Sequence, residues 1–122
     1  MQNSITWFEI PCRDLKRAVR FYEGMLEIQL EQTEFMGVPH GIFPGGGEGA
    51  LRGALIQDPN RQPGETGTLV YLNAEGKLDR AIERPPKQGG RVEVPRTSIG
   101  PQGFIAVVRD TEGNLVGLHS PS

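Results

Sequence analysis

The stretch ITWFEIPCRDLKRAVRFYEGML (residues 5–26) decides the fold. Its first six residues alternate between two faces and are rich in β-formers, which predicts a strand that ends at Pro11. Asp14 follows as a candidate N-cap, because its carboxylate can accept a free backbone N–H of the first helical turn. The apolar residues after it recur at helical spacing, opposite a charged face. The stretch therefore predicts a strand, a turn and an amphipathic helix.

The same order of elements is expected twice along the chain. Residues 28–58 predict three more strands after the first helix, and residues 67–120 again predict a strand, a helix and three strands. Residues 59–66 between them are polar and rich in turn formers, which predicts a linker. Within the second half, Pro95 is expected to break the strand region 91–99, because proline cannot donate to a sheet ladder.

A short similarity between the two halves supports an internal duplication. The segment DLKRAV (residues 14–19) resembles KLDRAI (residues 77–82), and both lie at the start of a predicted helix. The 122 residues are therefore expected to form one α+β domain, built from two tandem βαβββ modules at about residues 4–58 and 67–120.

Composition and charge argue against several functional classes. The net charge of −2 is mixed along the chain and no basic run stands out, so nucleic acid is not an expected partner. No apolar run approaches the roughly 18 residues of a membrane helix, and residues 1–10 lack the features of a signal peptide. A cytoplasmic location without a membrane partner is expected. The single Cys12 cannot form an intramolecular disulfide and is expected to be a small buried residue.

Three segments carry a resemblance to a known family: WFEIPCRDLKRAVRFYEGML near the start, GTLVYLNAEG in the middle, and GGRVEVPRTSIGPQGFIAVVRDTEGNLVGLHS at the end. With them the chain resembles the vicinal oxygen chelate superfamily, also called the glyoxalase/bleomycin-resistance/dioxygenase family, over essentially its whole length. The resemblance implies two βαβββ modules whose curved mixed sheets enclose a cleft. It also implies a homodimer, which is common in this superfamily.

The resemblance also says where a metal would bind. In the metal-dependent members four positions converge in the cleft, and three of them correspond to Trp7, Thr68 and Gly117, with the fourth in segment 52–58. An indole N–H only donates and glycine has no side chain, so these residues are poor ligands for a divalent metal. The metal site is therefore expected to be lost and no cofactor is expected. Whether the chain is an enzyme stays open.

Other residues on the expected cleft face are candidates for the site. Alternation points Glu9 the same way as Trp7, and His119 the same way as Gly117. If Glu9 and His119 lie close together, they form a candidate acid–base pair, because a carboxylate orients an imidazole and favours its charged form. The alternatives are a structural hydrogen bond, a solvated His119, or a displaced metal site that also uses Gln57. Trp7 either offers a flat face to a ligand or fills the vacated space.

Four further side chains have an open role. His40 is expected in a loop or hairpin, either exposed or at the mouth of the cleft. Tyr71 is expected to face away from the cleft and to pack under a helix. Arg52 and Arg109 either hold a ligand carboxylate or are ordinary surface arginines.

Three functional classes remain after these arguments. The leading one is a protein that binds a small organic molecule in the cleft without a metal, with Trp7 as platform and Glu9 and His119 as polar anchors. The further expected ligand contacts are Gln57, Thr68 and Gly117. The second is a metal-dependent lyase, isomerase or dioxygenase like other members of the superfamily. The third is a non-catalytic regulatory or scaffold dimer, because fold alone does not fix function.

Overall fold

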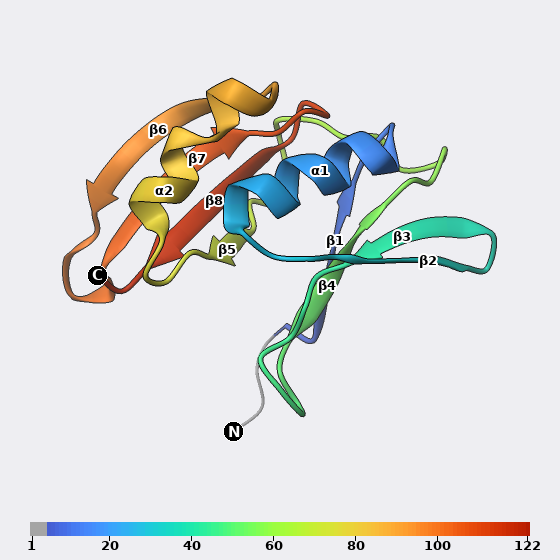
Figure 1. Ribbon diagram of the computed structural model, residues 1–122, viewed down its shortest axis with the longest axis horizontal. Helices are drawn as coiled ribbons and strands as arrows, with labels where there is room; N and C mark the ends of the chain where they lie inside the picture. The colour runs from blue at the N-terminus through green and yellow to red at the C-terminus, as the bar shows by residue number, and fades with distance from the viewer. Residues whose placement is uncertain (1–4) are drawn as a thin grey trace.

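Two four-stranded sheets with helices on one side make up the structure, a computed structural model that describes residues 5–122 (Figure 1). The first module contains β1 (Trp7–Pro11), α1 (Leu15–Leu26), β2 (Glu31–Phe35), β3 (Val38–Ile42) and β4 (Arg52–Ile56). The second contains β5 (Tyr71–Asn73), α2 (Leu78–Glu83), the 3-10 helix η1 (Pro85–Gln88), β6 (Arg91–Ser98), the 3-10 helix η2 (Gly100–Gln102), β7 (Phe104–Arg109) and β8 (Leu115–Ser120). This order confirms the predicted α+β fold with two tandem βαβββ modules.

The two sheets have the same topology. Their strand orders are β1-β4-β3-β2 and β5-β8-β7-β6, with a parallel pair formed by the first and last strand of each module. Buried residues from α1, α2 and both sheets form one hydrophobic cluster, so the two modules share a core. In the part of the chain that the structure describes, no helix is long and apolar enough to span a membrane.

Helix α1 begins as the sequence predicts. The Oδ1 atom of Asp14 accepts a hydrogen bond from the backbone N–H of Arg17 at 3.1 Å, which satisfies one of the free donors of the first turn. The apolar stripe of the helix is buried, with Ala18, Tyr22 and Met25 fully inaccessible. Periodicity and capping therefore place this helix correctly from local sequence alone.

Strand β6 differs from the prediction. It runs through Pro95 without a break, with irregular register between Val92 and Val94 and between Val94 and Thr97. Proline is tolerated here because β6 is an edge strand and pairs only with β7, so one side of its backbone needs no ladder partner.

The backbone shows which residues correspond between the modules. At the end of the first parallel pair, the N–H of Cys12 donates to the carbonyl of Ile56 at 2.8 Å. At the end of the second, the N–H of Ala74 donates to the carbonyl of His119 at 2.8 Å. Cys12 therefore corresponds to Ala74, and Ile56 corresponds to His119.

Counting back along these strands gives a second pair of equivalent positions. Glu9 lies beside Ala54 in the first module, and Tyr71 lies beside Gly117 in the second. Glu9 and Tyr71 thus occupy equivalent places on the first strand of each module, with different chemistry.

Candidate functional site

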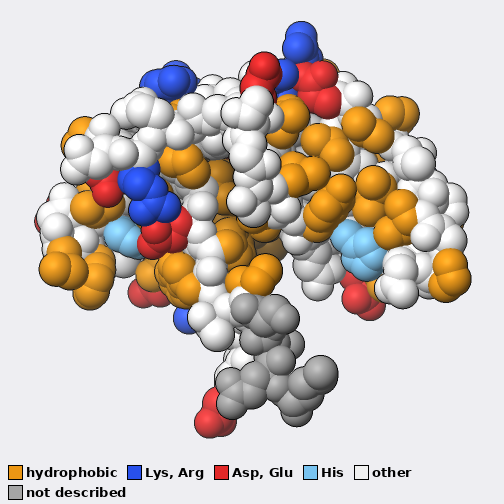
Figure 2. Space-filling view, turned by 180° about the vertical axis from the view of Figure 1, so that it is seen from behind, with side chains coloured by type: hydrophobic (Ala, Val, Ile, Leu, Met, Phe, Trp, Pro, Cys, Tyr) orange, Lys and Arg blue, Asp and Glu red, His pale blue; other side chains and the backbone are white. Residues whose placement is uncertain are grey.

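The side chain of Trp7 lies on the face of β1 opposite the shared core and is 43% exposed. Its Nε1 donates to Oε2 of Glu9 at 3.3 Å, two residues further along the same face. Arg61 of the segment 59–66 forms an ion pair with the other oxygen of Glu9 at 3.4 Å. Figure 2 shows hydrophobic side chains gathered around a hollow in the face behind the helices, with histidine on both flanks.

Two cavities meet at Trp7 and Glu9. The first, of about 390 Å³, lies between β1, the segment before β5 and the start of β8, and includes Thr68 and Asn114. The second, of about 330 Å³, lies between β1 and the β2–β3 hairpin, and includes His40. Both volumes fall within the roughly 300–1,000 Å³ of small-molecule sites. The indole ring therefore borders two adjacent spaces of useful size.

His40 lines the second cavity. The sequence had left open whether this histidine borders the cleft or is simply exposed. The neighbouring Gly41 packs against Val19 of α1, so alternation turns His40 to the opposite face of β3. Its Nδ1 lies 2.8 Å from the carbonyl oxygen of Val38. In a neutral ring this bond places the proton on Nδ1 and leaves Nε2 as an acceptor. The alternation of Val38, His40 and Ile42 was the sequence signal for this orientation.

The segment 59–66 forms a wall of the first cavity through Gln62, Gly64 and Thr66. It is held in place by a hydrogen bond from the N–H of Gly64 to Oδ1 of Asn114, at 3.0 Å. The segment therefore contributes to the candidate site as well as connecting the two modules. Its polar composition gave no indication of this role.

The structure gives Glu9 and His119 separate partners. Nε2 of His119 lies 2.7 Å from the carbonyl oxygen of Gln102, whereas Glu9 contacts Trp7 and Arg61. His119 lines neither of the two cavities at Trp7. Among residues 5–122 no hydrogen bond or ion pair joins Glu9 to His119, so the contacts do not support an acid–base pair within one chain.

The other candidate residues from the sequence lie in different surroundings. Thr68 lines the first cavity together with Trp7. Oε1 of Gln57 accepts from the backbone N–H of Leu15 at 2.7 Å, so this amide caps α1, and it lines a groove that does not include Trp7.

Gly117 is covered by an aromatic ring. A Cβ atom added at Gly117 would lie 2.2 Å from Cδ1 of Tyr71. The expectation that Tyr71 packs under a helix is wrong, because Tyr71 is 46% exposed and lies over Gly117 on its own sheet. The empty side-chain position of Gly117 is what makes room for the ring.

The residues at the positions that the resemblance assigns to a metal are poor ligands for a divalent cation. Trp7 offers only a donor N–H, Thr68 a neutral hydroxyl, and Gly117 no side chain at all. Across residues 5–122 there is no group of three His, Cys, Asp or Glu side chains that could hold a metal ion. Metal centres of this kind use several imidazole or carboxylate donors, which this donor set does not supply.

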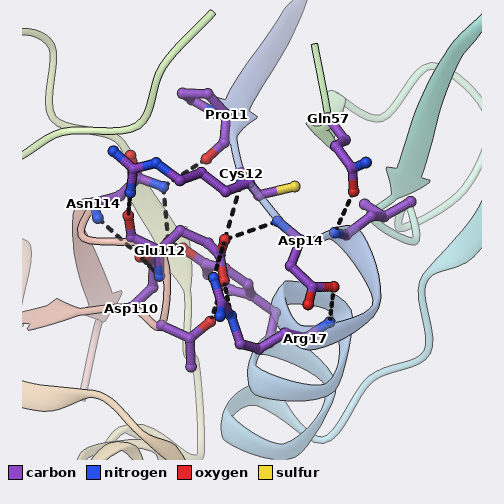
Figure 3. A network of polar contacts seen from close by, with 12 residues as sticks. Pro11, Cys12, Asp14, Arg17, Gln57, Asp110, Glu112 and Asn114 are labelled. Atoms are coloured by element: carbon purple, nitrogen blue, oxygen red, sulfur yellow. Dashed lines mark hydrogen bonds and ion pairs between the residues drawn. The ribbon is translucent and has the colours of Figure 1, made fainter. Parts of the chain in front are cut away.

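A buried polar network fixes β1 and α1 beside the first cavity (Figure 3). The side chain of Glu112, in the turn between β7 and β8, is inaccessible to solvent. Its Oε1 accepts from the backbone N–H groups of Arg13 at 2.8 Å and Asp14 at 3.0 Å. Burial by itself raises the pKa of Glu112, but hydrogen bonds from Arg17, Thr111 and these two N–H groups outweigh it and lower the pKa to about 2.

The same network holds the end of β1 against the second module. Nδ2 of Asn114 donates to the carbonyl of Pro11 at 2.7 Å, and the hydroxyl of Tyr22 donates to Oδ2 of Asp110 at 2.8 Å. Burial, with the nearby charge of Glu112, raises the pKa of the Cys12 thiol to about 12. Cys12 is 2% exposed, which confirms the prediction of a small buried residue.

These features define a class of protein: one domain of two βαβββ modules, each with its first and last strands parallel and adjacent. A model of the Glyoxalase/Bleomycin resistance protein/Dioxygenase superfamily matches residues 4–118, and the chain belongs to this superfamily. A search of curated proteins gave no match.

Solved structures show the same fold at low sequence identity. A glyoxalase/bleomycin resistance protein from Albidiferax ferrireducens has a TM-score of 0.75 at 17% identity, covering 97% of this chain and 98% of its own. A glyoxylase/bleomycin resistance protein/dioxygenase domain from Frankia sp. EAN1pec has a TM-score of 0.70 at 21% identity, covering 98% of both chains. A fosfomycin resistance protein from Listeria monocytogenes has a TM-score of 0.71 at 16% identity, covering 98% of this chain and 91% of its own.

Proposed function

We propose that this chain binds a small organic molecule against the indole of Trp7, without a metal. The observation that carries the proposal is the position of Trp7 between two cavities of suitable volume, with almost half of the side chain exposed. An exposed aromatic ring offers a flat apolar surface, and its Nε1 contact with Glu9 limits the orientations that the indole can take. Thr68 on one side and His40 on the other add polar groups that can orient a ligand.

The chain contains a single tryptophan, so its fluorescence reports directly on this site. The experiment titrates the protein with naphthalene compounds that carry an amine, no charge or a carboxylate. A saturable change in Trp7 emission for at least one of them is the expected result. Trp7→Ala should weaken that ligand by about tenfold or more, because aromatic anchors at the centre of a site dominate binding energy. Because Trp7→Ala removes the fluorescent reporter, calorimetry measures its affinity for the ligand. Trp7→Phe, which keeps an aromatic ring, should retain most of the affinity.

The two histidines provide a matched comparison for the polar anchor. His40 lines the second cavity at Trp7, whereas Nε2 of His119 is engaged by the carbonyl of Gln102. We therefore expect His40→Ala to lower the affinity for the ligand more than His119→Ala does. The acid–base role of Glu9 and His119 makes a separate prediction about reaction rate: His119→Ala would abolish any reaction found with that ligand.

A homodimer and a cytoplasmic location are part of the same proposal. Exposed apolar side chains at the β2–β3 turn, Phe35 at 63% and Met36 at 87%, support a contact between copies, because such a pair is unusual on a free surface. Light scattering after size exclusion tests the dimer, and a concentration-independent monomer mass would contradict it. A metal-dependent enzyme remains the alternative, tested by elemental analysis of protein purified without a metal-affinity step. Bound metal at one equivalent per chain would favour that alternative.

A further inference from the structure

The internal duplication provides a counterpart to the first cavity at Trp7. That cavity lies where the end of β1 meets the starts of β5 and β8. The equivalent place is where the end of β5 meets the starts of β1 and β4, and a separate cavity of about 230 Å³ lies there. The two cavities have diverged in charge. Tyr71 occupies the place of Glu9, and Arg52, the first residue of β4, occupies the place of Leu115, the first residue of β8.

Arg52 supplies the positive charge at this cavity of about 230 Å³, and no carboxylate in the described part of the chain neutralises it. Its Nε donates to the carbonyl of Phe43 at 3.1 Å, which orients the guanidinium. No carboxylate of residues 5–122 forms an ion pair with it, and none lines the cavity. Arg109, the other arginine considered as a carboxylate ligand, is instead occupied by Glu65 at 2.7 Å and Glu93 at 2.8 Å.

The remaining walls combine aromatic surface with donor groups. The rings of Phe8 and Phe43 lie 5.4 Å apart at an angle of 44°, and both line the cavity. Tyr71 and Asn73 also line the cavity, and the ring of Tyr71 rests over Gly117. A half-buried guanidinium with two polar neighbours beside aromatic rings suits a carboxylate attached to a flat apolar body.

We propose that this cavity, bounded by Phe8, Phe43, Arg52 and Tyr71, is a binding site for a small aromatic monocarboxylate. Its volume is below the roughly 300–1,000 Å³ of sites for drug-sized ligands, so the occupant carries a single ring. The carboxylate pairs with the guanidinium of Arg52, and the ring packs against the phenylalanines. The proposal rests on a different cavity from those at Trp7, although Phe8 lines both this cavity and the first one.

The test is an NMR titration of amide resonances with benzoate, and with benzamide as the neutral compound of the same shape. Benzoate should shift the resonances of Phe8, Arg52 and Tyr71 saturably. Benzamide should bind about tenfold more weakly or worse, since a charge-assisted hydrogen-bonded pair is lost. Arg52→Gln should weaken benzoate by a similar factor. Arg20→Gln, which removes an exposed charge of α1, should leave benzoate binding unchanged.

Tyr71→Phe removes the hydroxyl and keeps the ring. This variant should bind benzoate about threefold more weakly, which is the effect of losing one neutral hydrogen bond. The proposal is overturned if benzamide binds as tightly as benzoate, if no saturable shift occurs, or if the shifts centre on Trp7. It is equally overturned if a folded Arg52→Gln protein binds benzoate with unchanged affinity. The comparison of benzoate with benzamide on the unmodified chain decides the question even where that variant fails to fold.

Discussion

The guanidinium of Arg17 in α1 forms two hydrogen bonds with the carboxylate of Glu112 in the turn between β7 and β8, at 2.7 Å from Nε and 2.9 Å from Nη2. The two residues belong to different modules. Because Glu112 also accepts the backbone N–H groups of Arg13 and Asp14, directly before α1, its carboxylate joins the helix of the first module to the last hairpin of the second. The stability of the whole domain should therefore depend on this one side chain.

Replacement of Glu112 by glutamine should lower the free energy of unfolding by about 2–4 kcal/mol. The amide keeps the shape of the side chain but leaves the charge of Arg17 without a partner and replaces one acceptor oxygen with a donor. Urea denaturation measures the change. Glu48→Gln, in an exposed loop, is the control and should stay within about 0.5 kcal/mol of the unmodified protein. Equal stability of the two variants would contradict the role given to Glu112.

Acid should destabilise the domain through the same group. The pKa of Glu112 is lowered to about 2 in the folded state from an ordinary value of 4.5, so the unfolded state binds more protons between these values. The stabilisation is fully present above pH 4.5 and is lost as the pH falls towards 2. Unfolding experiments across this window should show a steep fall in stability for the unmodified protein and a shallower one for Glu112→Gln. Parallel curves would show that other carboxylates account for the acid sensitivity.

A side chain at Gly117 should displace Tyr71. An added Cβ would lie 2.2 Å from the tyrosine ring, so Gly117→Ala should cost about 1–3 kcal/mol by forcing the ring from its place on the sheet. In a Tyr71→Ala background the same substitution should cost much less, since nothing then opposes the new methyl group. A double-mutant cycle measured by thermal or urea unfolding gives this difference. Strictly additive costs would mean that the ring does not rest on Gly117 in solution.

Local signals were read correctly from the sequence. Asp14 was predicted as the cap of α1 because its acceptor serves a donor only three residues away. The two other acceptors at this helix end, Gln57 and Glu112, were not predicted. They approach Leu15 and Asp14 from 42 and 98 residues further along the chain, and nothing in the local sequence of α1 indicates them.

The parts that the sequence did not determine have the same origin. Alternation correctly placed Trp7 and Glu9 on one face of β1, but the distance between Glu9 and His119 depends on how two sheets are arranged, which alternation does not determine. His40 was expected in a loop or hairpin, and it lies in β3 of the β2–β3 hairpin. Whether it borders a cavity depends on how this hairpin lies against β1, which local sequence does not determine. Pro95 was read as a strand break because the sequence does not reveal that β6 is an edge.

The long-range capping of α1 has a consequence for synthesis of the chain. Proteins are made from the N-terminus, and domains fold as their segments emerge from the ribosome. Glu112 lies 99 residues after Arg13 in the chain. The N–H groups of Arg13 and Asp14 at the entry to α1 therefore lack this acceptor until almost the whole chain has been translated. The nascent first half therefore emerges with an incomplete helix and an exposed apolar stripe. That interval is the stage at which we expect this protein to be most dependent on chaperones.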